Sequence, residues 1–171
     1  RQAPARYFGV PEQMLGGTVS LSAAPVRMRG LPAVVTVPRL ALGASAGVGT
    51  LDEDERAAGV MAFDAHWLRR LGVRPQRVSI IRVDGESMAP TLSDGDDIMV
   101  DHDDDDAGRL RDGVYVLRLD GVLMVKRIAT GPLRGQISVV SDNAHYPDWA
   151  NIDPALVEIV GRVVWTGRRL T

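Results

Sequence analysis

A serine in a rigid turn is the first residue of this sequence whose surroundings suggest chemistry. Ser87 lies in residues 85–92, which read Gly-Glu-Ser-Met-Ala-Pro-Thr-Leu and follow a short apolar run. Pro90 fixes its own backbone and disfavours a helical Ala89, so the serine is held firmly. Capping of a turn is the alternative role for such a serine. Because a serine hydroxyl is a weak nucleophile until a neighbouring base accepts its proton, a catalytic role requires a base elsewhere in the chain.

Lys126 is the best candidate for that base. The three histidines, His66, His102 and His145, fall in a probable helix, an acidic run and a turn, where surface or packing roles are expected. Among the 20 basic residues only Lys126 is a lysine, and it ends an apolar, strand-like run. Burial there would lower the pKa of its amine and leave it neutral enough to act as a general base. The sequence therefore favours a Ser-Lys dyad.

Short apolar runs indicate the strands that would position these two residues. Strands are expected over residues 34–42, 78–83, 97–101, 113–119, 122–128, 137–140 and 157–165. The Asp120-Gly121 pair predicts a hairpin turn that places Lys126 on a central hairpin. Strands at such short intervals, joined by Gly and Asp turns, predict a compact, coiled, mainly β domain with little helix.

Two further features refine this expectation. Pro38 would make its strand an edge strand or a bend, because proline has no backbone N–H to donate. Residues 53–72 are expected to be partly helical, with an apolar stripe that faces the core. That stripe consists of Phe63, Trp67, Leu68 and Leu71.

Several motifs, in this order, resemble the peptidase domain of the LexA, UmuD and phage CI-type repressors. They are the serine segment with Asp-Gly-Asp at 94–96, the lysine strand at 120–128, Ser-Asp-Asn at 141–143 with Tyr-Pro at 146–147, and the last strand at 159–165. The resemblance implies that Ser87 is the nucleophile and Lys126 the general base of a self-cleaving serine peptidase with a mostly β fold. It also implies cleavage of an Ala-Gly bond and stimulation by RecA filaments. Signal peptidases share the serine and lysine motifs and are the nearest alternative family.

The cleavage loop is expected at residues 43–49, where Ala46-Gly47 is the candidate scissile bond. Small residues there would let the backbone enter a narrow cleft, and glycine would supply the turn back to the serine. A flexible glycine loop is the alternative interpretation. Backbone N–H groups of Glu86 and Ser87 are the expected donors to the oxyanion, since no side-chain donor is evident there.

The chain is expected to have three parts. Residues 1–17 resemble the tail of a helix-turn-helix DNA-binding domain, with a plain N-terminal tail as the alternative, and residues 18–33 are expected to be a linker. Residues 34–171 would form the peptidase and dimerisation domain. The apolar strand at 157–165 is either the homodimer contact or internal core.

Composition limits the partners and the compartment. A net charge of −2 gives no basic field for nucleic acid, so operator DNA would be bound through the N-terminal domain. The absence of cysteine fits a reducing cytoplasm, and no apolar stretch is long enough for a membrane helix. Four adjacent aspartates at 103–106 are expected to form a solvated loop rather than a cation site, so neither metal nor cofactor is expected.

Two functional hypotheses follow. In the first, the protein is a transcriptional repressor of the SOS or prophage type that relieves repression by cutting itself at Ala46-Gly47. In the second, the same domain serves only for dimerisation and signal sensing, with cleavage silent.

Overall fold

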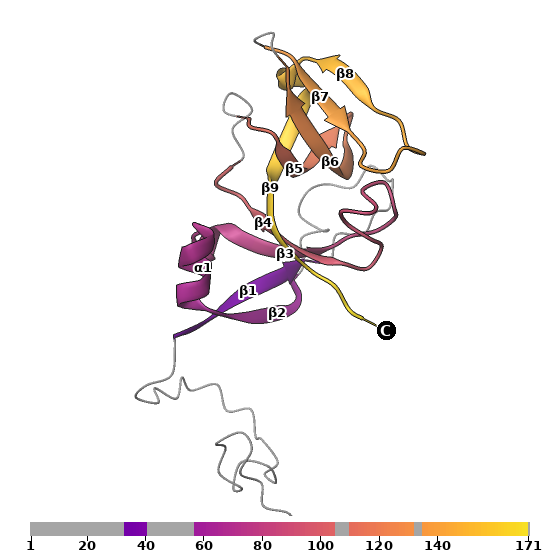
Figure 1. Ribbon diagram of the computed structural model, residues 1–171. Coiled ribbons are helices and arrows are strands. Elements are labelled where there is room, and N and C mark those ends of the chain that lie inside the picture. The colour runs from indigo at the N-terminus through magenta and orange to yellow at the C-terminus, as the bar shows by residue number, and fades with distance from the viewer. Residues whose placement is uncertain (1–32, 41–56, 105–109, 132–134, 171) are drawn as a thin grey trace, which may run out of the picture. The chain divides into compact units, whose positions relative to one another are not determined.

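The described part of the chain forms one mixed β-sheet. The computed structural model describes residues 33–40, 57–104, 110–131 and 135–170, all within one compact unit. The strands lie in the order β2-β1-β3-β4-β9-β5-β6-β7-β8 (Figure 1). Their bounds are β1 (Val34–Leu40), β2 (Ala57–Asp64), β3 (Val78–Arg82), β4 (Asp97–Asp101), β5 (Gly113–Leu119), β6 (Val122–Thr130), β7 (Ile137–Val140), β8 (Trp149–Ile152) and β9 (Val157–Gly167). The expectation of a mainly β fold is confirmed. The tail and linker expected at 1–17 and 18–33 lie outside the described residues, apart from Ala33.

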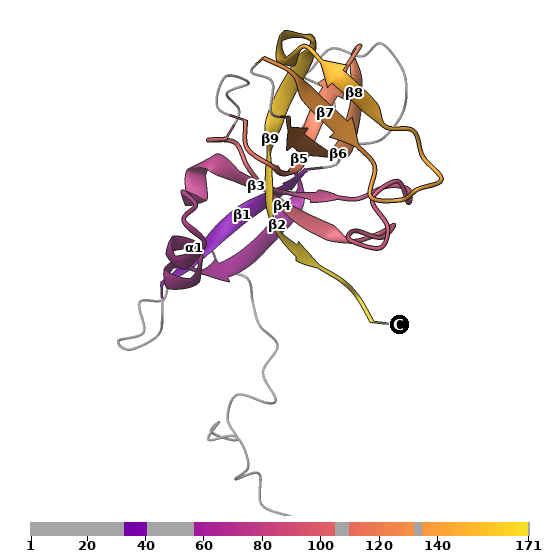
Figure 2. The same ribbon diagram turned by 45° about the horizontal axis from the view of Figure 1, so that its top comes forward.

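Strand β9 joins the two halves of the sheet. Its first part pairs with β5, from Val157 to Arg162, and its second part pairs with β4, from Arg162 to Gly167. Figure 2 shows β9 running between the β1–β4 half and the β5–β8 half. Each backbone edge of β9 is therefore paired over part of the strand, one edge with β5 over residues 157–162 and the other with β4 over residues 162–167.

The hairpin that carries Lys126 forms as predicted. Strands β5 and β6 pair from Gly113↔Ile128 to Leu119↔Val122, which leaves only Asp120 and Gly121 in the turn. Their φ angles of 52° and 76° are the left-handed values that a tight hairpin turn of this kind requires.

The helix expected within residues 53–72 is present, but it begins after Phe63, the first residue of the predicted apolar stripe. Residues 57–64 form β2, which pairs antiparallel with β1, and only Ala65–Leu71 is helical, as α1. Asp64 ends the strand and begins the helix, since its carboxylate accepts a 2.7 Å hydrogen bond from Trp67 N. Pairing with β1 outweighs the apolar spacing that suggested a longer helix.

Of the two alternatives for the strand that contains Pro38, an edge strand or a bend, the edge strand is wrong; the pairing with β2 is irregular directly after Pro38, between Arg39 and Leu40. Strand β1 lies between β2 and β3. Its pairing with β3 involves only Arg39 and Leu40, so Pro38 stands just before this ladder and its missing N–H leaves no gap in it.

Apolar packing forms a core in each half of the sheet. In the β1–β4 half, Phe63 stacks on Trp67 with ring centroids 5.4 Å apart, and Trp165 meets both rings edge-on at 5.8 and 6.0 Å. We call Phe63, Trp67 and Trp165 the aromatic cluster. The predicted stripe is thus core, although Phe63 comes from a strand. No helix among the described residues is long and apolar enough to cross a membrane.

Candidate active site

Ser87 lies in the turn that follows β3. Gly85, with φ 87°, begins the turn, and Ala89 N donates to Glu86 O at 3.1 Å. Met88 and Leu92, which both follow Ser87, are buried in the core, so the turn is anchored while Ser87 itself stays half-buried. The chain then returns through Asp96, whose buried carboxylate pairs with Arg168 at 2.7 Å.

Lys126 lies on β6 and is buried, with only 5% of its surface exposed. Its Nζ donates a 2.7 Å hydrogen bond to Ser141 Oγ and lies 5.7 Å from the centroids of the Tyr146 and Trp149 rings. Burial lowers the pKa of the Lys126 amine, and the nearby charge of Asp148 opposes this only in part. The burial expected from the strand pattern is therefore observed.

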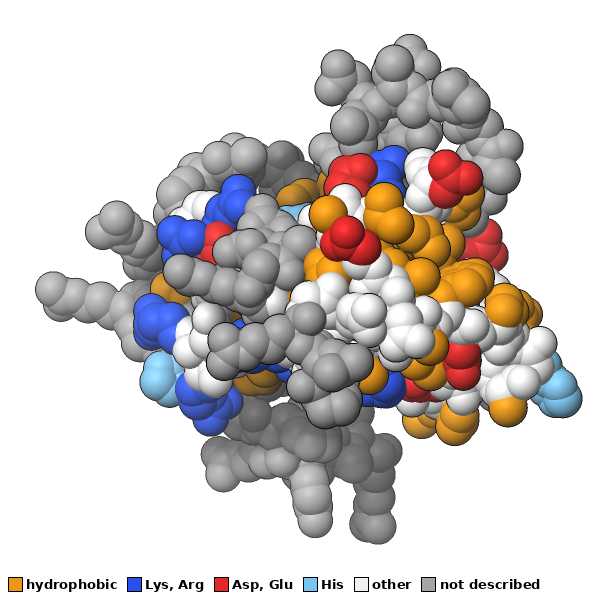
Figure 3. All heavy atoms as spheres, turned by 90° about the horizontal axis from the view of Figure 1, so that it is seen from above, with side chains coloured by type: hydrophobic (Ala, Val, Ile, Leu, Met, Phe, Trp, Pro, Cys, Tyr) orange, Lys and Arg blue, Asp and Glu red, His pale blue; other side chains and the backbone are white. Residues whose placement is uncertain are grey.

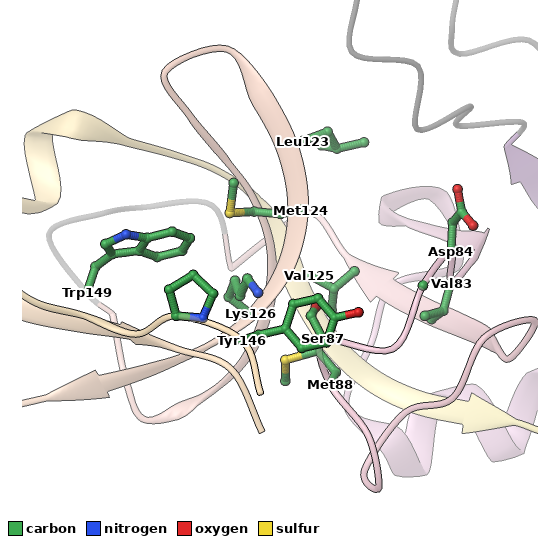
Figure 4. Close-up of a pocket in the computed structure, with 12 residues that line it drawn as sticks. Val83, Asp84, Ser87, Met88, Leu123, Met124, Val125, Lys126, Tyr146 and Trp149 are labelled. Carbon is green, nitrogen blue, oxygen red and sulfur yellow. The ribbon is translucent and has the colours of Figure 1, made fainter. Parts of the chain in front are cut away.

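Ser87 and Lys126 line the same pocket, which has a volume of about 300 Å³. Three segments form its wall, namely the turn after β3, the first part of β6, and the residues that lead into β8. Figure 4 shows the side chains of Ser87, Lys126 and Tyr146 together at its centre, between Trp149 on one side and Asp84 on the other. The structure thus brings together the two residues that the sequence proposed as a dyad.

The remaining residues singled out in the sequence lie elsewhere. None of the three histidines lines the pocket. His66 and His145 are exposed, whereas His102 contacts Ser79 Oγ and Val160 O at 2.8 and 3.0 Å. Ala46 and Gly47 lie outside the described residues.

The acidic run at 103–106 is described only in part. Asp103 pairs with Arg74 and Arg77, and Asp104 pairs with Arg111. Arg74 and Arg77 hold the pKa of the Asp103 carboxyl down to about 2. These two carboxylates therefore serve as partners of neighbouring arginines.

Residues 141–143 were not assigned a role from the sequence, yet each contacts the parts of the chain that carry Ser87 or Lys126. Ser141 accepts from Lys126 Nζ, Asp142 pairs with Arg127, and Asn143 donates to the carbonyls of Glu86 and Ser87. The family resemblance included these three residues as a motif, but their local signal in the sequence was no more than a polar run directly after a predicted strand. Such a run is equally typical of an ordinary turn.

A family model supplies the classification. The Peptidase S24-like model matches residues 40–164, which cover most of the chain and include both Ser87 and Lys126. The chain belongs to the Peptidase S24-like family. The resemblance to LexA, UmuD and phage CI-type repressors is thereby confirmed.

A curated relative agrees with this classification. The chain is 35% identical over 115 residues to the 26 kDa repressor protein of Escherichia phage HK022. The match covers 62% of this chain and 45% of the relative, so the chain spans about half the length of the curated repressor that it matches.

Proposed function

We propose that this Peptidase S24-like protein is a transcriptional repressor, of the SOS or prophage type, that inactivates itself by cutting the Ala46-Gly47 bond. The observation that carries the proposal is the position of Ser87 beside a buried lysine in one pocket. Burial gives Lys126 a lowered pKa, and the neutral amine is the form that can take a proton from serine.

The reaction proposed is acyl transfer in two stages. Ser87 Oγ attacks the carbonyl carbon of Ala46 while Lys126 Nζ accepts the hydroxyl proton. The ammonium then gives that proton to the nitrogen of Gly47 as the peptide bond breaks, and water releases the acyl group from the serine. Backbone N–H groups at the Glu86–Ser87 turn would stabilise the oxyanion, and the Ser87 N–H donates to no residue of the described part of the chain.

The topology supports cleavage within one molecule. Leu40, the last described residue of β1, pairs with Ile81 near the end of β3, and β3 leads directly to Ser87. Ala46 is only six residues beyond Leu40, a stretch that spans up to about 20 Å when extended. The segment returns at Ala57, opposite Leu40. The candidate bond is therefore tethered at both ends close to the strand that presents the serine, and the rate should not depend on protein concentration.

The test is self-cleavage of the purified chain, followed by mass spectrometry of the fragments. Wild type should be cut between Ala46 and Gly47, whereas Ser87→Ala and Lys126→Ala should each abolish cutting while keeping the fold. His145→Ala changes an exposed side chain outside the pocket and is the matched control, which should cut like wild type. An intact wild-type chain at alkaline pH and with RecA filaments would instead favour the cleavage-silent repressor.

The pH profile tests the general base. Because the pKa of Lys126 is lowered from its ordinary value, the neutral amine should already form below the titration range of an exposed lysine. The first-order cleavage constant should rise with pH through the pKa of Lys126 and then level off. A rate that is constant from mildly acidic to strongly alkaline pH would exclude Lys126 as the base.

We also propose that the protein is a homodimer that binds operator DNA through a part outside the described sheet. The chain has a net charge of −2, so the sheet domain alone should bind DNA weakly. Hydrophobic side chains gather on the face seen in Figure 3. Val122 of β6 and Leu156, just before β9, are among the exposed large apolar residues of the described chain. Sedimentation at micromolar concentration tests the dimer, and a strict monomer would exclude it.

A further inference from the structure

We propose that residues 141–143, directly after β7, form a bracket that fixes the general base relative to the nucleophile. The bracket is Ser141, Asp142 and Asn143, and each residue holds a different atom group of the two catalytic segments. Its catalytic role rests on the proposed self-cleavage, whereas its contacts with Lys126 and with the serine turn can be tested without any cleavage.

The sheet itself does not fix the distance between the two catalytic segments. Ser87 follows β3, and Lys126 lies on β6, and these strands are separated in the sheet by β4, β9 and β5. Small changes in twist across three intervening strands would accumulate at the pocket. The apolar core that includes Met88 packs against Leu123 and Val125 of β6, which holds the two segments close, and directional contacts are needed in addition to fix the two side chains in reacting geometry.

Ser141 orients the amine of Lys126. Its Oγ accepts from Lys126 Nζ at 2.7 Å, while its own hydroxyl donates to Pro147 O at 3.0 Å. With that hydroxyl proton committed to the carbonyl, Ser141 can only accept from the lysine. The lone pair of a neutral Lys126 amine is thus not used by Ser141 and stays available for the proton of Ser87.

Asn143 holds the serine turn from the other side. Its Nδ2 donates to Glu86 O at 2.9 Å, and its backbone N donates to Ser87 O at 3.1 Å. The orientation of the side-chain amide is defined, because Asn143 Oδ1 accepts from His145 N at 3.0 Å. Two consecutive carbonyls of the turn are therefore fixed by one residue.

Asp142 is the second residue of the bracket, and it contacts β6. Its carboxylate binds Arg127, the neighbour of Lys126 on β6, through two hydrogen bonds of 2.6 Å. The Thr91 side chain, on the serine turn, also lowers the pKa of this carboxyl. Arg127 above all, and Thr91 in addition, hold the pKa of the Asp142 carboxyl below its usual range. The Asp142 carboxylate therefore stays ionised at the pH of cleavage and keeps its ion pair with Arg127.

The titration of Lys126 gives the first test. Lys126 is the only lysine in the chain, so lysine labelled with ¹⁵N and ¹³C gives one side-chain signal whose pH titration reports its pKa directly. All variants are made in the Ser87→Ala background, so no sample cuts itself. Ser141→Ala removes a hydrogen-bond acceptor from the Lys126 ammonium and should lower the pKa of Lys126 further. Ser141→Thr keeps the hydroxyl and should give the same Lys126 pKa as the Ser87→Ala parent.

The outcomes of this titration separate the bracket from the proposed self-cleavage. His145→Ala, the neighbouring exposed change, should titrate like the parent. An unchanged Lys126 titration in Ser141→Ala would overturn the bracket, even if wild type cleaves. A wild type that never cleaves would end the proposed function, while the shift of Lys126 would still support the bracket.

Cleavage kinetics give the second test, for Asn143. Asn143→Leu keeps the approximate size of the side chain and adds no charge, but it cannot donate to Glu86 O, so the plateau of the first-order constant should fall about tenfold or more. The pH midpoint should stay in place, because Asn143 does not contact the amine of Lys126. Faster hydrogen exchange at residues 86–89 should accompany the loss, independently of cleavage. A variant with the wild-type plateau and wild-type exchange would show that Asn143 does not hold the turn.

Discussion

The aromatic cluster and the bracket each connect separate elements of the fold, the first by apolar ring contacts and the second by hydrogen bonds. The aromatic cluster joins β2, α1 and β9 through ring contacts between 5.4 and 6.0 Å. The bracket joins β6 to the serine turn through hydrogen bonds between 2.6 and 3.1 Å. Ring packing tolerates small shifts, whereas hydrogen bonds fix particular atoms, so the part of the molecule that needs reacting geometry adds polar contacts to its apolar anchors Met88 and Leu92.

The largest expected effect lies in the aromatic cluster. Trp165→Ala removes the ring that meets both Phe63 and Trp67, and should lower the free energy of unfolding by about 3 kcal/mol. Urea unfolding measures the loss. Cleavage per folded molecule should be unchanged, since Trp165 does not line the pocket.

Leu170→Ala is the control for this prediction, because Leu170 is 94% exposed and should contribute little. A Trp165→Ala protein with wild-type stability would show that the cluster is not a core. Loss of a dimer with the stability retained would place Trp165 at a subunit contact instead, in keeping with the alternative that the strand at 157–165 carries the interface.

The sequence predicted the elements whose signals are local. Alternating or continuous apolar runs identified β3 to β7 and β9, and the Asp120-Gly121 pair identified the hairpin turn of Lys126. The same hairpin placed an ammonium on a strand with buried neighbours, which is why its burial was expected. The pairing of Ser87 with Lys126 in one pocket followed from the chemistry that a serine needs.

The parts that were missed depend on contacts distant in the sequence. Residues 57–64 contain alanine, glycine and methionine, which indicate no particular structure, and only pairing with β1 makes them a strand. The bracket was missed because Asn143 and Glu86 are 57 residues apart and no periodicity relates them. The resemblance pointed to the Ser-Asp-Asn motif, but only the structure shows what each of its side chains holds.

A smaller effect is expected at a polar contact inside the sheet but away from the pocket. Ser79 Oγ lies 2.8 Å from His102 Nε2, and His102 Nδ1 donates to Val160 O on β9. Ser79→Ala should therefore cost about 1 kcal/mol of stability, the usual contribution of one hydrogen bond, with the pH profile of cleavage unchanged. Ser138→Ala, a serine on β7 outside this contact, is the matched control. A shifted cleavage profile in Ser79→Ala would mean that polar contacts throughout the sheet, and not only the bracket, tune Lys126.

The smallest expected change in stability comes from Lys126 itself. Lys126→Met keeps the length of the side chain and removes a charge that burial disfavours, so in the Ser87→Ala background the free energy of unfolding should stay equal or rise by up to about 1 kcal/mol. The same change should abolish cleavage when Ser87 is present. The lysine would then be kept for its chemistry at no gain in stability.

The pH dependence of this difference decides whether the charge is its cause. The pKa of Lys126 is lowered in the folded protein, so between that value and the ordinary lysine pKa of about 10.4 the unfolded chain binds more protons than the folded one. The stability of the parent should therefore rise with pH across this window, whereas Lys126→Met lacks this rise. The advantage of Lys126→Met should be full below the folded pKa of Lys126, shrink as the pH rises through the window, and be lost above about 10.4, as measured by urea unfolding at several pH values. An advantage that is the same at every pH would assign it to packing of the methionine, and would argue that the buried ammonium carries no penalty in this pocket.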